Sequence, residues 1–213
     1  MLLTELIENI GISNKSISSN IPRKSYKLHG AGIQATAYSH PRKPNSIVKI
    51  ASISGENDPI YQFTKLCMEH TDNPFLPKIY TARLYNAKPT GYDTDSEENK
   101  TQLTHKLFIS MEKLQFLTKQ IDPNIVEQLF KEIGISLSGN NVASWDILLK
   151  RIFFTKEGRV QILQQTNNSQ LKEALTLLEP LFQKFRPDMR MGNLMLRTTV
   201  NPPQIVILDP ITH

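Results

Sequence analysis

Residues 185–196 read FRPDMRMGNLML, and this short stretch sets charged and amide side chains at fixed spacing in an apolar background. Asp188 is followed five positions later by Asn193, with Arg190 and a glycine between them. A solvated loop could hold such residues at any spacing, whereas a site that handles phosphate and metal needs them at set distances. The stretch therefore marks a candidate loop for phosphate chemistry, and the rest of the chain has to supply its partners.

The composition of the chain bounds its class. Its 213 residues are 39% hydrophobic and 21% charged, which suits one compact domain, with room for two lobes. The excess of basic over acidic side chains, 25 against 20, is too small to predict specific nucleic-acid binding. A single cysteine, Cys67, excludes an internal disulfide framework and a cysteine-based zinc cluster, so the cytoplasm is the expected compartment. No uncharged apolar run approaches the ~18 residues of a membrane span, and no membrane partner is predicted.

The first 24 residues predict a short amphipathic helix and a polar linker. The opening MLLTELIENIG alternates leucine and isoleucine with glutamate at helical spacing, and Gly11 ends the pattern. Because the glutamates interrupt the apolar residues, we expect no signal peptide. Residues 13–24 are polar and contain a proline, as is typical of a linker.

The chain after the linker has the pattern of strands. Residues 26–52 predict three antiparallel strands separated by a glycine turn and a proline-marked turn. Residues 58–70 predict a helix, because an aspartate N-cap and a proline at the first helical position open it. Two more strands are expected at 78–85 and 103–112, joined by an acidic loop that we interpret as solvated.

The C-terminal half has the period of helices. We predict helices over 122–134, 142–154 and 170–185, with a turn or short hairpin at 156–160 (KEGRV) between the last two. The apolar run that ends in Asp209 has the pattern of a buried strand with one carboxylate at its tip. The fold class is therefore α+β, with a strand-rich first half and a helix-rich second half.

Two further features are ambiguous when taken alone. The glycine turn Gly30–Ala31–Gly32 would let backbone N–H groups approach a phosphate, but glycine also serves simple hairpin turns. Lys49 lies in an apolar strand and points either to solvent or toward a phosphate. Their order in the chain reduces the ambiguity: glycine turn, strand lysine, D-x-x-x-x-N, then an apolar strand with its aspartate.

This order resembles the protein-kinase fold family, whose glycine-rich loop, strand lysine, catalytic-loop aspartate and asparagine, and metal-binding aspartate follow one another. Four blocks resemble more narrowly the early serine/threonine protein kinases of T-seven-like short-tailed phages: ATAYSHPRKPNSIVKI (35–50), LFISMEKL (107–114), DMRMGNLML and VILDPIT. The resemblance covers roughly residues 26–212 and is dense only in these blocks. It implies a bilobal kinase-like fold within 25–213, with an N-lobe over about 25–112 and a shortened helical C-lobe over about 113–213.

The resemblance also implies roles for the matched residues. Asp188 would orient or deprotonate the attacking hydroxyl, and Arg190 would stabilise charge near the γ-phosphate. Asn193 and Asp209 would hold Mg²⁺ against the phosphates of ATP. The nucleotide-binding set would comprise Gly30, Ala31, Gly32, Lys49 and a hinge of Met111, Glu112 and Lys113. The implied activity is ATP- and Mg²⁺-dependent phosphorylation of serine or threonine in proteins, with host proteins as targets in the host cytoplasm.

The sequence departs from the usual kinase pattern around both aspartates. Pro187 stands where an arginine usually precedes the catalytic aspartate, so no ordinary pocket for an activation-loop phosphate is expected. Pro210–Ile211 replaces Phe-Gly, so a mobile switch at the metal aspartate is not expected. With only four residues after Asp209, we expect neither an activation segment nor the later substrate-binding helices.

A missing glutamate keeps two other function classes open. The middle of the 58–70 helix offers no glutamate for Lys49, so Glu56 or Glu69 would have to serve. The first alternative is a catalytically weak pseudokinase that binds a nucleotide or a partner. The second is a small-molecule phosphotransferase of the aminoglycoside-kinase type, although such enzymes keep a larger substrate lobe.

Overall fold

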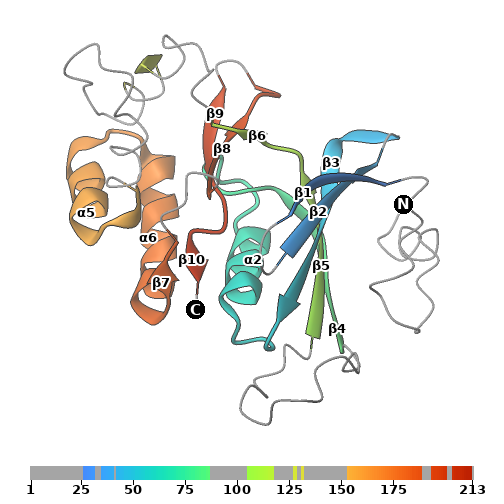
Figure 1. The fold of residues 1–213 in the computed structure, drawn as a ribbon. Helices are drawn as coiled ribbons and strands as arrows, with labels where there is room; N and C mark the ends of the chain where they lie inside the picture. Colours follow the sequence, from blue (N-terminus) through green and yellow to red (C-terminus); the bar gives the residue numbers. More distant parts are fainter. Residues whose placement is uncertain are drawn as a thin grey trace. The chain divides into compact units, whose positions relative to one another are not determined.

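The structure is a computed structural model that describes residues 26–31, 35–40, 42–86, 105–117, 127–128, 131, 153–188, 193–200 and 203–212. Within these ranges the fold is α+β, as predicted, with a five-stranded antiparallel sheet, two smaller sheets and three helices (Figure 1). The chain divides into two compact units. The first comprises Met1–Met68 and Lys78–Lys113, and the second comprises Glu69–Pro77 and Leu114–His213.

The first unit is built on the five-stranded sheet. Its strands, in spatial order, are β1 (Lys27–Ala31), β2 (Ala35–His40), β3 (Lys43–Ile53), β5 (His105–Glu112) and β4 (Ile79–Asn86), and every neighbouring pair is antiparallel. The strands predicted over 26–52, 78–85 and 103–112 are thereby confirmed. Strand β5 pairs along its whole length with β3 and along most of it with β4, and its apolar side chains from Leu107 to Met111 are almost fully buried.

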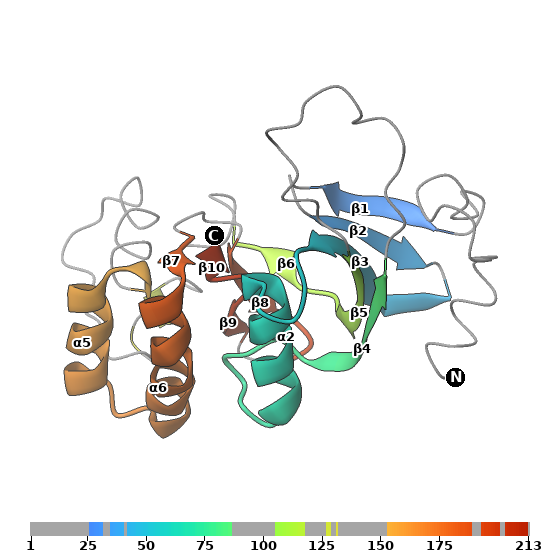
Figure 2. The same cartoon turned by 90° about the horizontal axis from the view of Figure 1, so that it is seen from below.

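Helix α2 (Pro59–Glu69) confirms the helix predicted at 58–70 and lies beside the sheet in both views (Figures 1 and 2). Its capping chemistry is the expected one, because the Asp58 carboxylate accepts the N–H of Ile60 at 3.0 Å. The same carboxylate accepts the N–H of Ser54 at 3.0 Å, which ties the end of β3 to the helix. The helix buries Phe63 and Cys67, and Cys67 is a free cysteine.

The second unit contains two helices and two small sheets within its described residues. The helices are α5 (Lys156–Gln165) and α6 (Ser169–Lys184). One sheet has the order β6 (Gln115–Phe116), β8 (Leu194–Arg197), β9 (Gln204–Ile207), and the other pairs β7 (Arg186–Pro187) with β10 (Ile211–Thr212). Helix α6 confirms the helix predicted at 170–185, and β9 confirms the buried strand before Asp209.

The predicted turn or hairpin at 156–160 is wrong, because these residues form the start of α5. Thr155 caps the helix, with its hydroxyl oxygen accepting the N–H of Gly158 at 3.0 Å. Arg159 then anchors the helix: its guanidinium contacts Glu179 at 3.1 Å and lies 3.9 Å from the centre of the Phe182 ring. These tertiary contacts outweigh the low helix propensity of a glycine, which the sequence pattern cannot show.

The segment Glu69–Pro77 belongs to the second unit, although it lies in the range expected for the N-lobe. Asn73 donates its side-chain N–H to the carbonyl of Gln170 at 2.9 Å. Arg197 donates to two carbonyls of the segment at 2.6 and 3.0 Å, and the N–H of Ile207 donates to a third at 2.8 Å. Partners about a hundred positions along the chain therefore hold this segment, and no local pattern signals them.

Several predicted elements fall outside the described residues. They are the N-terminal helix and linker of 1–24, the acidic loop after 86, nearly all of the 122–134 helix and most of the 142–154 helix. In the part of the chain that is described, no helix has the length and apolarity needed to cross a membrane.

Candidate active site

Main-chain hydrogen bonds in the second unit bring three of the predicted site residues together: Asp188, Asn193 and Asp209. The N–H of Asp188 donates to the carbonyl of Pro210 at 2.8 Å. The N–H of Leu208 donates to the carbonyl of Asn193 at 2.7 Å. Both ends of the 188–193 loop are thus bonded to the residues on either side of Asp209.

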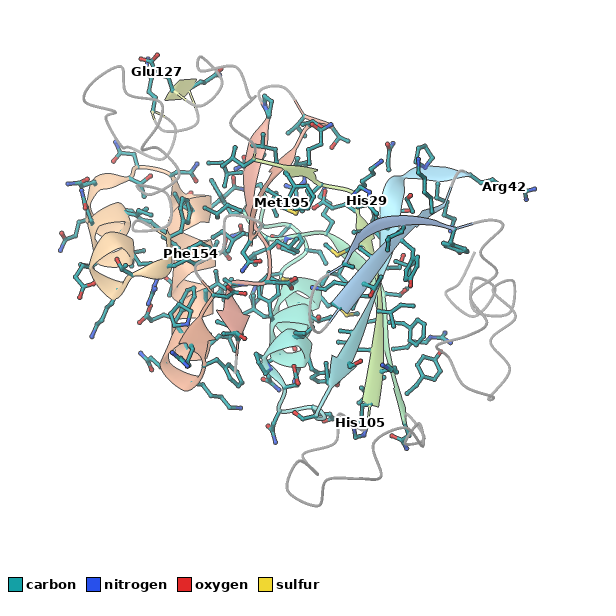
Figure 3. The ribbon with its side chains drawn as sticks, in the orientation of Figure 1. His29, Arg42, His105, Glu127, Phe154 and Met195 are labelled. Atoms are coloured by element: carbon teal, nitrogen blue, oxygen red, sulfur yellow. The ribbon has the colours of Figure 1, made fainter. Side chains whose placement is uncertain are left out.

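Strand pairing explains why these two connections lie side by side. Leu194 is opposite Ile207 in the β8–β9 pair, and Pro187 is opposite Ile211 in the β7–β10 pair. Strand β7 pairs with β10, and β8 pairs with β9. The connection from β7 to β8 and the connection from β9 to β10 therefore both run from one of these strand pairs to the other. The facing side chains of β8 and β9 are buried, and the apolar residues at 194–196 and 205–207 are each at most 5% exposed. This burial stabilises the pairing of the two strands. Met195, one of these residues, is labelled in Figure 3.

The amide of Asn193 is held in one orientation. Its Nδ2 donates to the carbonyl oxygen of Asp188 at 3.0 Å, and the side chain is 8% exposed. Because a carbonyl can only accept, the amide nitrogen must face Asp188, and the oxygen Oδ1 faces away from that bond. An amide oxygen and a carboxylate are ligands that Mg²⁺ prefers, so Asn193 and Asp209 fit the predicted metal role chemically.

Asp209 has an unusual backbone conformation, with a φ of 46°. The left-handed region is costly for residues with a side chain, although aspartate tolerates it better than most. Surroundings that enforce such a conformation are common where a side chain has a functional task. Among the described residues no three or more His, Cys, Asp or Glu side chains gather to hold a metal ion alone.

Lys49 lies in β3 of the first unit, opposite Ala37 on one side and Ile109 on the other. Its side chain is 8% exposed, so it does not project into bulk solvent. A buried ammonium group is stable only beside acceptors or anions, which agrees with a phosphate-binding position. Of the two glutamates considered for it, Glu56 precedes α2 and Glu69 is its last residue, and both are exposed.

The glycine turn is described in part. Gly30 and Ala31 form the end of β1, next to a register shift in the β1–β2 pair, whereas Gly32 lies outside the described residues, as does Arg190. A Cβ added to Gly30 would meet no atom within 4 Å. Packing within the protein therefore does not require glycine here, and the open space is available to a ligand.

The predicted hinge residues Met111, Glu112 and Lys113 lie at and just after the end of β5. The N–H of Glu112 donates to the carbonyl of Lys78 at 3.0 Å, and its carboxylate accepts the N–H of Lys78 at 2.7 Å. The N–H of Lys113 donates to the carbonyl of Asn45 at 2.9 Å. Two N–H groups of this segment are therefore used within the sheet, and its contact with adenine stays a prediction.

His29 lies on β1 (Figure 3), and its pKa is lowered from the ordinary value. Partial burial is the larger cause and the positive charge of Lys113 is the second. Both disfavour the imidazolium form, so His29 is mainly neutral at pH 7.

Sequence reasoning missed the main-chain groups that assemble the site. The carbonyl of Pro210 and the N–H of Leu208 position the loop, yet their residue types give no sign of it. The sequence gives only an indirect sign of these bonds. The apolar runs after the 188–193 loop and before Asp209 predict strands that can pair with each other.

Comparison with known proteins gives little beyond this geometry. No protein-family model matches the chain, and no curated protein matches it. Among solved structures the chain is similar to the MAP kinase LmaMPK10 from Leishmania major, with 13% sequence identity and a TM-score of 0.39. The match covers 99% of this chain and 50% of that one, so the chain spans about half the length of the solved kinase. A likeness this weak carries no argument, and function has to be argued from the residues.

Proposed function

We propose that this chain is a kinase-like phosphotransferase that uses ATP and Mg²⁺ to phosphorylate serine or threonine hydroxyls of proteins. The observation that supports the proposal is that main-chain hydrogen bonds join Asp188 to Pro210 and Leu208 to Asn193, so that Asp188 and Asn193 are bonded to the two neighbours of Asp209. Phosphoryl transfer needs such a set, because catalysis consists of positioning and charge stabilisation. By the resemblance to early phage kinases, the substrates are host proteins and the site of action is the host cytoplasm.

Each residue has a task in the reaction that we propose. The substrate hydroxyl oxygen forms a bond to the γ-phosphorus while the bond from that phosphorus to the ADP oxygen breaks, and Asp188 accepts the hydroxyl proton. Asn193 and Asp209 would hold Mg²⁺, which when bound neutralises charge on the phosphate oxygens. Lys49 would bind nucleotide phosphates as a point charge.

Three further parts of the proposal involve the glycine turn, which the structure describes in part, Arg190, which lies outside the described residues, and the hinge of 111–113. The turn Gly30–Gly32 would close over the phosphates, and Arg190 would stabilise charge at the γ-phosphate. The hinge of 111–113 would meet adenine through its backbone.

A second candidate is a nucleotide-binding module that transfers no phosphate. It is favoured by the positions of Glu56, which precedes α2, and Glu69, which ends it, because both are exposed and neither lies in the middle of the helix. In active kinases a glutamate on the corresponding helix orients the strand lysine. A module of this kind would bind ATP but leave it intact.

The experiment is transfer of labelled γ-phosphate from ATP to proteins of a cell lysate, with Mg²⁺ present. The test variant is Asp188→Asn, which keeps the shape of the side chain and removes its basicity. Asp72→Asn is the matched control, because Asp72 is an exposed acid in a turn. We expect Asp188→Asn to lower transfer by about 10²- to 10⁴-fold, the usual contribution of a general base, and the control to leave it unchanged.

Two results would contradict parts of the proposal. Equal labelling by the wild type and Asp188→Asn would show that Asp188 does not act as the general base. Stabilisation of the wild type by ATP in a thermal unfolding scan, without any labelled product, would favour the binding module instead.

A further inference from the structure

Two features restrict the backbone conformation of Asp209. Asp209 has a φ of 46°, and the residue that follows it is a buried proline. A proline disfavours the right-handed helical region for the residue before it, because its ring clashes with the preceding backbone. Of the regions open to a residue with a side chain, this leaves the extended one, which a following proline favours, and the left-handed one that Asp209 adopts.

Hydrogen bonds on both sides oppose the extended choice. On one side the N–H of Leu208 is bonded to the carbonyl of Asn193 at 2.7 Å, and on the other the carbonyl of Pro210 accepts from Asp188 at 2.8 Å. Directly after Pro210, Ile211 pairs with Pro187. An extended Asp209 would redirect the chain between these fixed points and break the bond to Asp188 or the strand pair.

We propose that Pro210 is a positioning residue for Asp209, which it holds with its carboxylate set in advance for a divalent cation. The ring of Pro210 removes the right-handed alternative, and the flanking hydrogen bonds remove the extended one. A ligand group that is already in place loses less conformational freedom on binding, so its cation is bound more tightly. This inference rests on the proposed function in one respect, namely that Asp209 is a ligand of Mg²⁺.

The test variants are Pro210→Ala and Pro210→Gly in the full chain. Both keep the carbonyl that accepts from Asp188, and they differ in how much backbone freedom they restore. Pro203→Ala is the matched control, because it removes the same ring from the residue just before strand β9, six positions before Asp209. Thermal unfolding of each variant establishes that it is folded.

The probe is Mn²⁺, whose binding to the protein in the presence of ATP is followed by electron paramagnetic resonance. We expect Pro210→Gly to weaken Mn²⁺ binding about tenfold, as expected when one residue regains its backbone freedom. Pro210→Ala should lie between Pro210→Gly and the wild type, and Pro203→Ala should match the wild type. The amide hydrogen of Asp188 should exchange faster in Pro210→Gly. In the transfer assay the variants should show a higher KM for Mg²⁺ with little change in kcat.

The outcomes separate the two claims. If the wild type transfers phosphate and both folded Pro210 variants bind Mn²⁺ as the wild type does, the positioning role is overturned and the proposed function stands. If the wild type neither binds Mn²⁺ with ATP nor transfers phosphate, the proposed function itself is overturned, and this inference with it. The proposal is supported if Mn²⁺ binding is weaker in Pro210→Ala than in the wild type, weaker still in Pro210→Gly, and unchanged in Pro203→Ala.

Discussion

Replacement of Arg159 by methionine should destabilise the second unit more than any surface substitution. The side chain of Arg159 is 5% exposed and makes three contacts at once. Its Nη1 donates to the carbonyl of Phe154 at 3.1 Å, its Nε contacts Glu179 at 3.1 Å, and its guanidinium lies 3.9 Å from the centre of the Phe182 ring. Methionine keeps most of the apolar volume and removes all three polar contacts.

The magnitude follows from the three contacts taken separately. The buried carbonyl of Phe154 would lose a donor, which costs about 1–3 kcal/mol. Loss of the cation–π contact with Phe182 adds roughly 0.5–2 kcal/mol. The ion pair adds under about 1 kcal/mol, because the Glu179 side chain is 35% exposed and water can replace the arginine. The expected loss in the free energy of unfolding is about 3 kcal/mol.

Urea unfolding followed by circular dichroism measures this loss directly. For a chain of this length, ~3 kcal/mol also lowers the melting temperature by about 6–12 °C. Glu179→Gln is the matched control, since it weakens only the exposed partner and should cost under about 1 kcal/mol. A cost below about 1 kcal/mol for Arg159→Met, equal to that of Glu179→Gln, would show that the buried carbonyl and ring contacts are not energetically significant.

Three other predictions concern the first unit. Asp58→Ala removes the cap of α2 and should cost about 1–2 kcal/mol in urea unfolding, whereas Asp58→Asn should keep most of it, and equal costs would refute the capping account. Gly30→Ala should leave the unfolding midpoint unchanged, since its Cβ meets no atom, and lower ATP affinity in calorimetry; a large loss of stability would contradict the geometry. Because the pKa of His29 is lower in the folded protein than its ordinary value of about 6.5, the unfolded chain binds the proton more readily, and stability should fall as the pH drops through that value. His29→Gln should reduce this loss between pH 7.5 and 5.5, and an identical pH profile would refute the shift.

Local chemistry made the first unit predictable from its sequence. The helix at 58–70 was predicted from an aspartate cap and a proline, and the structure contains that hydrogen bond. The strands β1, β2 and β3 follow one another along the chain and pair in that order through short connections, whereas the pairing of β3 with β5 crosses β4 in sequence and was not predicted. The same reasoning placed the apolar strand before Asp209 correctly.

Long-range contacts account for what the sequence pattern did not predict. Helix α5 contains a glycine and a short polar stretch that indicate a turn, and the bonds of Arg159 to α6 decide otherwise. The segment Glu69–Pro77 is held by Arg197 and Ile207, far along the chain. At the candidate site the order of residues was readable, but the main-chain bond from Asp188 to Pro210 was not, because any residue type carries a carbonyl.

The most direct test of the central claim is whether the purified chain places phosphate from ATP on serine or threonine side chains. Mass spectrometry of a protein mixture incubated with the chain, ATP and Mg²⁺ identifies the modified residues. We predict phosphoserine and phosphothreonine with the wild type and with Asp72→Asn, and their loss with Asp188→Asn. Absence of both products with the wild type, or their persistence with Asp188→Asn, would contradict the assignment of the 188–193 loop as a phosphoryl-transfer site.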